Sequence, residues 1–162
     1  MKSLKIRLIG GLGNQLFQVA FGYSLRRIYS IPVIYDISAF KNYKLHKLVV
    51  DKLFPNMPFL NIKNNIFQIP IKEKYCGFDE MLFQRITNSL IYRNIYLSGY
   101  FQSLAYFSNE LPEIKSLVLI GNSLTMELGY RCRTLCELTK ALRHQYGGLS
   151  SFKSGIFKVQ ID

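Results

Sequence analysis

Long apolar runs are absent from this sequence of 162 residues, although 49% of its residues are hydrophobic. A helix that spans a bilayer needs ~20 consecutive apolar residues, so we expect no transmembrane helix. The basic start of the chain breaks into glycines after Ile9, before an apolar stretch of the length typical of secretory signals can form. We therefore predict a protein that is not secreted and is soluble or peripheral to a membrane. The high apolar content excludes an intrinsically disordered chain.

Cysteine and histidine are scarce, with three and two residues respectively. The cysteines Cys76, Cys132 and Cys136 are odd in number and form no paired framework, which favours free thiols in a reducing cytoplasm. Cys132 and Cys136 stand close together with His144 further along the chain, but a zinc site needs tighter spacing and a fourth ligand. We expect unrelated thiols there and no bound metal.

Acidic residues are few: ten of them face 21 lysines and arginines, which gives a net charge of +11. The basic residues are scattered singly or in short pairs such as Arg26 and Arg27, without the clusters or the glycine-aromatic signature of a nucleic-acid-binding domain. We expect no nucleic-acid partner and interpret the charge as a general solvated surface. Attraction to anionic lipid head groups stays open as an alternative, and would place the protein at the inner face of the cell membrane.

The start of the chain has the pattern of a strand, a glycine turn and a helix. Apolar and basic residues alternate between Leu4 and Leu8, with Ile9 following, and this predicts a strand. From Leu16 to Ile28 apolar and small residues recur at helical spacing, and residues 31–35 form a short β-branched run. Strand, helix and strand in this order predict a βαβ unit and an α/β fold with a Rossmann-like parallel sheet. The length predicts about one domain.

The later segments are less regular. Prolines and asparagines interrupt the segment from Phe40 to Ile71, for which we expect short helices and no long element. Apolar spacing predicts a helix over residues 78–92, a strand over residues 95–100 and a further helix from about Ser103. The aromatic residues are 14% of the chain, and we expect most of them in the core.

The turn Gly10-Gly11-Leu12-Gly13-Asn14-Gln15 separates the first predicted strand from the first helix. Backbone N–H groups and the helix dipole favour an anion at such a place, and glycines let a ligand approach closely, so a phosphate or sugar contact is one interpretation. The other is a tight turn in which Asn14 merely caps the helix, and the residues alone do not choose between them. A dinucleotide fingerprint fails because Leu16 replaces its third glycine, which makes a nicotinamide cofactor a remote alternative.

Two blocks of sequence carry a family resemblance. The first is Gly10-Gly11-Leu12-Gly13-Asn14-Gln15-Leu16-Phe17-Gln18, followed by residues 20–25, Pro32 and Asp36-Ile37-Ser38. The second is Tyr96-Leu97-Ser98-Gly99-Tyr100-Phe101-Gln102-Ser103 with Tyr106-Phe107. In order and approximate distance, the two blocks closely resemble motifs of the α-1,2-fucosyltransferases, glycosyltransferase family 11.

The resemblance implies transfer of fucose from GDP-fucose to the 2-hydroxyl of a galactose-containing glycan, with inversion and without a metal or other cofactor. It also implies a two-domain GT-B fold, whose N-terminal half this chain resembles, and a place in surface polysaccharide or O-antigen assembly. The glycine turn would bind the donor and the second block would line the cleft between the domains. Donor binding is thereby implied for Gly11, Leu12, Gly13, Asn14 and Gln15, and a cleft-lining position for Gly99, Tyr100, Phe101 and Gln102.

The resemblance ends at about Val118. The family's later His-x-Arg-Arg-Gly-Asp-Tyr block, whose arginines bind the donor diphosphate, is not matched by residues 131–133, and the absence of tryptophan excludes its Ser-Trp-Trp region. We expect a Rossmann-like domain over residues 1–118, a divergent tail over residues 119–162 and no second domain. We hypothesise a frameshift or premature stop that impairs activity. The alternatives are a genuine short variant, a non-catalytic α/β binding fragment or a partner subunit, and an uncovered inter-domain face would favour self-association.

Three further positions carry ionisable side chains of interest. Asp36 ends a predicted strand on the cleft side, where it would either orient a sugar hydroxyl or cap the next helix, and both interpretations stay open. For His46 we favour a packed or surface histidine over a general base. Asp79 begins a predicted helix and suits the helix dipole. No catalytic base is identified.

Overall fold

The computed structural model describes residues 2–62, 68–74, 77–91 and 93–114. The divergent tail predicted over residues 119–162 lies outside this part of the chain, and so do Cys76, Cys132, Cys136 and His144.

The described chain is built on one parallel sheet. Its strand order is β3-β2-β1-β5-β4, and every neighbouring pair is parallel. The strands are β1 (Leu4–Arg7), β2 (Val33–Asp36), β3 (Phe59–Leu60), β4 (Gln68–Lys72) and β5 (Asn94–Ser98). The predicted βαβ unit and the α/β, Rossmann-like class of fold are confirmed.

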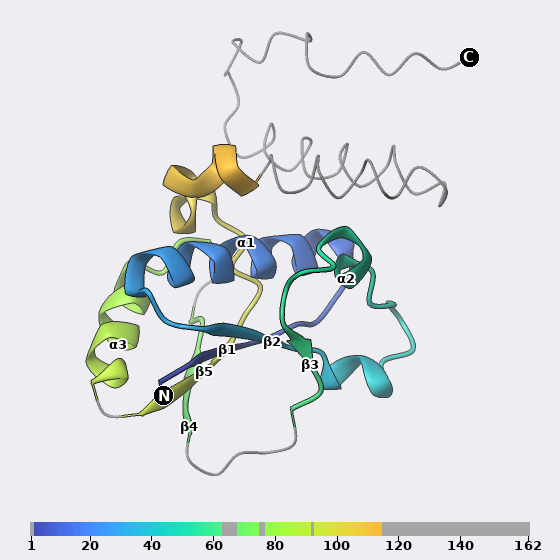
Figure 1. Cartoon of the computed structure of the whole chain (residues 1–162), viewed down its shortest axis with the longest axis horizontal. Helices are drawn as coiled ribbons and strands as arrows, with labels where there is room; N and C mark the ends of the chain where they lie inside the picture. Colours follow the sequence, from blue (N-terminus) through green and yellow to red (C-terminus); the bar gives the residue numbers. More distant parts are fainter. Residues whose placement is uncertain (1, 63–67, 75–76, 92, 115–162) are drawn as a thin grey trace, which may run out of the picture.

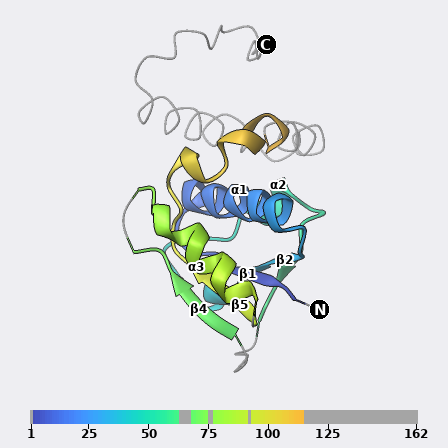
Figure 2. The same ribbon diagram turned by 90° about the vertical axis from the view of Figure 1, so that its left-hand side faces the viewer.

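Helices connect these strands. The α-helices are α1 (Leu12–Tyr29), α2 (Val50–Leu53) and α3 (Glu80–Leu90), and the 3-10 helices are η1 (Ser38–Lys41), η2 (Leu104–Tyr106) and η3 (Ser108–Glu110). Figures 1 and 2 show α1 and α3 on the same side of the sheet. Residues 104–114 lie over α1, on the side of the helix that faces away from the sheet. None of the described helices is both long and apolar enough to cross a membrane.

Two sequence-based expectations about these elements are wrong. The segment from Phe40 to Ile71 contains not only short helices but also β3 and most of β4, which the sequence analysis did not predict. Pro70 obscured β4, and the strand tolerates it because β4 lies at the edge of the sheet, where a missing N–H leaves no neighbour unpaired. The helix expected from Ser103 is instead the short η2, and Ser103 caps it by accepting a hydrogen bond from Ala105 N at 3.3 Å.

The sheet is buried on the face that α1 and α3 cover. Strand residues with side chains on this face, such as Ile6 and Leu97, are fully buried, whereas the alternate positions Arg7 and Lys72 are exposed. Phe21 of α1 packs against Phe83 of α3 with ring centroids 6.0 Å apart, so the two helices share one core. This aromatic core agrees with the expectation from the sequence.

Candidate functional site

The candidate site lies at the carboxyl ends of β1 and β5, which are neighbours in the middle of the sheet. The crossovers from β1 through α1 to β2 and from β4 through α3 to β5 run in the same direction across the sheet, which places α1 and α3 on one face. Parallel α/β sheets bind ligands outside the carboxyl ends of their strands. The glycine turn follows β1 and residues 99–102 follow β5, so the fold brings the two sequence blocks together at this point.

Gln18 joins the two blocks directly. Its side chain accepts a hydrogen bond from Ile9 N at 3.1 Å and donates one to Gly99 O at 2.8 Å, and it is 0% exposed. Beyond its place in the first sequence block, no role for Gln18 was expected from the sequence. A buried amide whose oxygen and nitrogen both form hydrogen bonds with the backbone holds the bonded segments together. The side chain of Gln18 in this way fixes the end of β1 against the end of β5.

Asn14 and Gln102 form a second link between the blocks. Gln102 Nε2 donates a hydrogen bond to Asn14 Oδ1, and Asn14 is only half-buried. The alternative in which Asn14 caps the helix is wrong, because the N-cap residue of α1 is Gly11 and no side chain caps it. Two amide side chains from distant parts of the sequence thus meet at the surface above the glycine turn.

The N-terminus of α1 points its backbone donors into the same place. The first intrahelical hydrogen bond runs from Gln15 N to Gly11 O at 3.0 Å, so the N–H groups of Leu12, Gly13 and Asn14 have no carbonyl partner within the helix. Around Gly13 the space is open, since a Cβ atom added there would meet nothing within 4 Å. Together with the helix dipole, these donors make a suitable environment for a phosphate or another anion.

Gln15 is placed differently from the other residues of the turn. It is 0% exposed, and its Nε2 donates to Gly10 O and to Lys47 O, both at 2.9 Å. Its Oε1 accepts from Val49 N at 3.1 Å and Val50 N at 3.2 Å. All the hydrogen-bonding capacity of the amide is therefore used by backbone, and Gln15 fastens the segment before α2 to the glycine turn.

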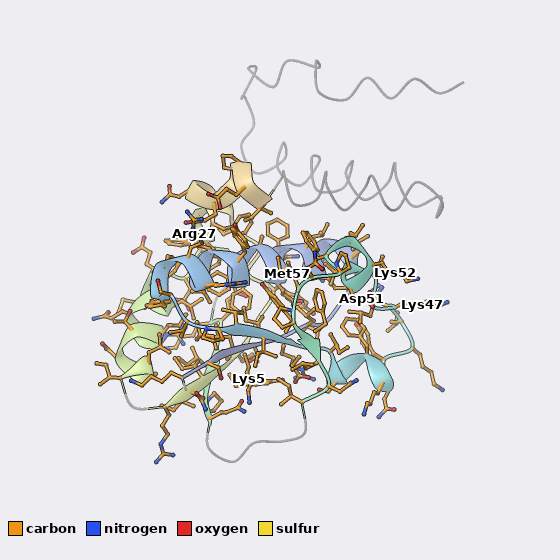
Figure 3. The ribbon with its side chains drawn as sticks, viewed as in Figure 1. Lys5, Arg27, Lys47, Asp51, Lys52 and Met57 are labelled. Atoms are coloured by element: carbon orange, nitrogen blue, oxygen red, sulfur yellow. The ribbon has the colours of Figure 1, made fainter. Side chains whose placement is uncertain are left out.

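That fastened segment carries two lysines and a histidine beside the turn. Lys44, His46 and Lys47 are all exposed, and a Cβ atom added at Gly11 would lie 3.6 Å from His46 Nδ1. Figure 3 shows Lys47 at the end of the molecule where α1 begins. His46 is thus a surface histidine, as favoured from the sequence, but it borders the candidate site, and its ring centroid is 5.7 Å from that of Tyr43.

The turn after β5 contains an exposed and a buried aromatic side chain. Tyr100 is 44% exposed, whereas Phe101 is 0% exposed and stacks on Phe21 with ring centroids 4.4 Å apart. Phe101 has a φ of +52°, in the left-handed region that bulky residues rarely adopt. Of these two predicted cleft-lining residues, Tyr100 therefore presents its side chain to solvent and Phe101 presents only backbone.

Asp36 is buried, with 2% of its surface exposed. Its Oδ1 accepts hydrogen bonds from Ser38 N at 2.9 Å and Ile62 N at 3.2 Å, and its Oδ2 accepts from Tyr96 OH at 2.6 Å. Burial, and then the bond to Asp36, raise the pKa of Tyr96 above its ordinary value. Asp36 Oδ1 thus holds the turn that leads into η1, but it does not cap η1, whose N-cap residue is Ile37 without a side-chain cap, so the capping interpretation is wrong.

No cluster of metal ligands is found in the described ranges. Three or more His, Cys, Asp or Glu side chains do not gather anywhere within residues 2–62, 68–74, 77–91 and 93–114 closely enough to hold a metal ion. The metal site considered at Cys132, Cys136 and His144 lies outside these ranges.

Comparison with known proteins finds a curated relative of the chain. No protein-family model and no solved structure matches the chain. A curated protein of Escherichia coli, alpha-1,2-colitosyltransferase, is 29% identical over 137 residues, which cover 72% of this chain and 45% of that protein. The chain thus spans less than half the length of this relative. At a coarse level, the similarity relates the chain to glycosyltransferases.

Proposed function

We propose that the chain binds the donor of a fucosyltransferase-like reaction, in which fucose passes from GDP-fucose to the 2-hydroxyl of a galactoside. The observation that carries the proposal is that two separated sequence blocks meet at the carboxyl ends of β1 and β5. Gln18 bonds to Gly99, and Gln102 bonds to Asn14. Both blocks resemble α-1,2-fucosyltransferases, and the similarity to a colitosyltransferase supports a sugar transferase.

The chemistry suits the N-terminus of α1. When the bond between the anomeric carbon and the β-phosphate oxygen breaks, the electron pair stays on that oxygen and negative charge grows there. Backbone N–H donors already held in place at Leu12, Gly13 and Asn14 would stabilise this charge. The acceptor oxygen bonds to the opposite face of the anomeric carbon and loses its proton to a base that we do not assign.

Within this proposal the predicted donor-binding residues divide into two groups. Gly11, Leu12, Gly13 and Asn14 are partly exposed and offer the contacts, whereas Gln15 acts only by holding the surrounding backbone. Gln102 and Tyr100 are placed to border the bound sugar diphosphate. Asp36 supports the fold at the carboxyl end of β2 and takes no part in binding.

Ligand-dependent stability of the full chain tests the proposal. A ligand at a hundred times its Kd raises the free energy of unfolding by about 2.7 kcal/mol, so GDP-fucose and GDP should both raise the Tm, and NAD should not. Asn14→Ala should weaken the shift, whereas Asn88→Ala, at an exposed position of α3, should leave it unchanged. Stabilisation by NAD alone, or by none of these compounds, would overturn the proposal.

Turnover is a separate question because the chain spans 45% of its relative. Incubation with GDP-fucose and a galactoside, followed by linkage analysis of the product, distinguishes an active transferase from a chain that only binds the donor. A GDP-linked colitose offered in parallel tests which sugar is preferred. Binding without turnover would favour the second candidate, a non-catalytic binding fragment or partner subunit.

A further inference from the structure

Glu73 lies directly after β4 and its carboxylate reaches the turn after β5. Its Oε2 accepts hydrogen bonds from Tyr100 N and from Phe101 N, both at 2.9 Å. Its Oε1 accepts one from Tyr106 OH at 3.2 Å. One half-buried carboxylate therefore holds two successive backbone N–H groups of the second sequence block and a buried tyrosine behind them.

The surrounding backbone is shaped for this contact. A Cβ atom added at Gly99 would lie 2.6 Å from Glu73 Cβ and 2.7 Å from its Oε2, so only glycine lets the carboxylate approach so closely. Phe101, two residues after Gly99, adopts its φ of +52° while donating its N–H to the same oxygen. A bulky residue in this region of backbone space carries strain, and the structure around it must compensate.

The described ion pairs do not include this carboxylate. Within the ranges that the structure describes, the ion pairs are Arg27 with Glu113 and Arg85 with Asp79. The charge of Glu73 is instead met by hydrogen-bond donors of the turn that leads to Gln102. Hydrogen bonds to an ionised acceptor are about twice as strong as those between neutral groups, which suits the carboxylate to hold a strained turn.

We propose that Glu73 is a positioning residue of the candidate site: its carboxylate sets the turn at residues 99–101 so that Gln102 reaches Asn14 and Tyr100 stands at the edge of the site. This inference rests on the proposed function. In this role Glu73 acts through the turn rather than on the ligand. From β4 it fixes one wall of the site, while Gln18 from α1 fixes the same turn through Gly99 O.

The experiment has one arm that needs no ligand and one that uses GDP as the probe. Amide hydrogen exchange at Tyr100 and Phe101 in the full chain should be about 10-fold faster or more in Glu73→Ala and unchanged in Glu80→Ala, a matched loss of an exposed carboxylate on α3. The Kd for GDP should rise about 10-fold in Glu73→Ala and stay within about 3-fold in Glu73→Gln, whose amide oxygen still accepts both N–H groups.

The outcomes separate the two proposals. A Kd unchanged in Glu73→Ala, or unchanged exchange at Tyr100 and Phe101, would overturn the positioning role, and a lower Tm with an unchanged Kd would make Glu73 merely structural. If Glu73→Ala does not fold, Glu73→Asp gives the same information, since it keeps the charge but is too short to reach both N–H groups. Failure of the unmodified chain to bind GDP would overturn the proposed function, while the exchange arm would still decide whether Glu73 holds the turn.

Discussion

Gly22 lies where α1 packs tightly against the sheet. A Cβ atom added there would lie 2.5 Å from Tyr35 Oη and 2.8 Å from Ile6 Cδ1, inside the distances that real side chains show. Gly13, the second residue of the same helix, faces open space. Two glycines of one helix thus have different surroundings, close packing against the sheet at Gly22 and open space at Gly13.

Alanine at these two positions should therefore have opposite effects on stability. Gly22→Ala should lower the free energy of unfolding by about 1–3 kcal/mol, because helix and strands must move apart in a packed core. Gly13→Ala should leave it unchanged or raise it by up to about 1 kcal/mol, since alanine is the better helix former. Urea unfolding of both variants measures the difference. Equal destabilisation by the two substitutions would contradict the packing role of Gly22.

At the scale of elements, buried amides of α1 hold the strands and loops of the site together. Gln18 fastens the end of β1 to the end of β5, and Gln15 fastens the glycine turn to the segment before α2. Each of these side chains is 0% exposed. Removing one of them leaves part-buried backbone groups without these hydrogen-bond partners.

Gln18→Ala should lower the free energy of unfolding by about 2–5 kcal/mol, because Ile9 N and Gly99 O each lose a hydrogen bond and a cavity opens. Gln84→Ala, at an exposed position of α3, removes the same atoms and should change the stability by less than about 0.5 kcal/mol. Chemical denaturation of both variants provides the comparison. If the free energy of unfolding fell by a similar amount in both variants, Gln18 would not be holding the ends of β1 and β5 together.

The hydrophobic pattern of the sequence predicts most of the elements but not the buried polar residues that join them. Periodicity identified β1, α1, β2, α3 and β5, since each has a regular apolar face. It missed β3, which has two residues, and β4, which is interrupted by Pro70. Periodicity also equates polar with exposed, so it failed at Gln18, whose partners are backbone atoms of Ile9 and the remote Gly99. Glu73 was missed for the same reason, because its donors follow a different strand.

At the scale of the whole molecule, three tyrosine hydroxyls join different elements of the fold. Tyr35 OH of β2 donates to Val19 O of α1 at 3.0 Å, Tyr96 OH of β5 donates to Asp36 Oδ2 of β2 at 2.6 Å, and Tyr106 OH donates to Glu73 after β4 at 3.2 Å. Burial is the main cause that raises the pKa of each hydroxyl above its ordinary value of 10.0. The folded chain therefore depends on protonated tyrosines in three places.

This dependence predicts that the fold loses stability in alkaline solution. A raised pKa means that the folded chain keeps its phenolic proton at a pH where the unfolded chain has released it. The contribution of Tyr35 and of Tyr106 is therefore complete below pH ~10 and is lost as the pH rises from there towards the folded-state pKa, by about 1.4 kcal/mol per pH unit for each of them. Urea unfolding between pH 8 and about pH 11 should show this decline.

Tyr35→Phe separates the titration from the packing. This variant should be less stable than the unmodified chain by about 1 kcal/mol near neutral pH, because the hydrogen bond to Val19 O is lost. Its decline above pH ~10 should nevertheless be shallower by about 1.4 kcal/mol per pH unit, because one titrating group has been removed. Tyr43→Phe, at an exposed position, should leave the slope unchanged. An equal slope in Tyr35→Phe and the unmodified chain would mean that the hydroxyl of Tyr35 ionises as readily in the folded protein as in the unfolded one.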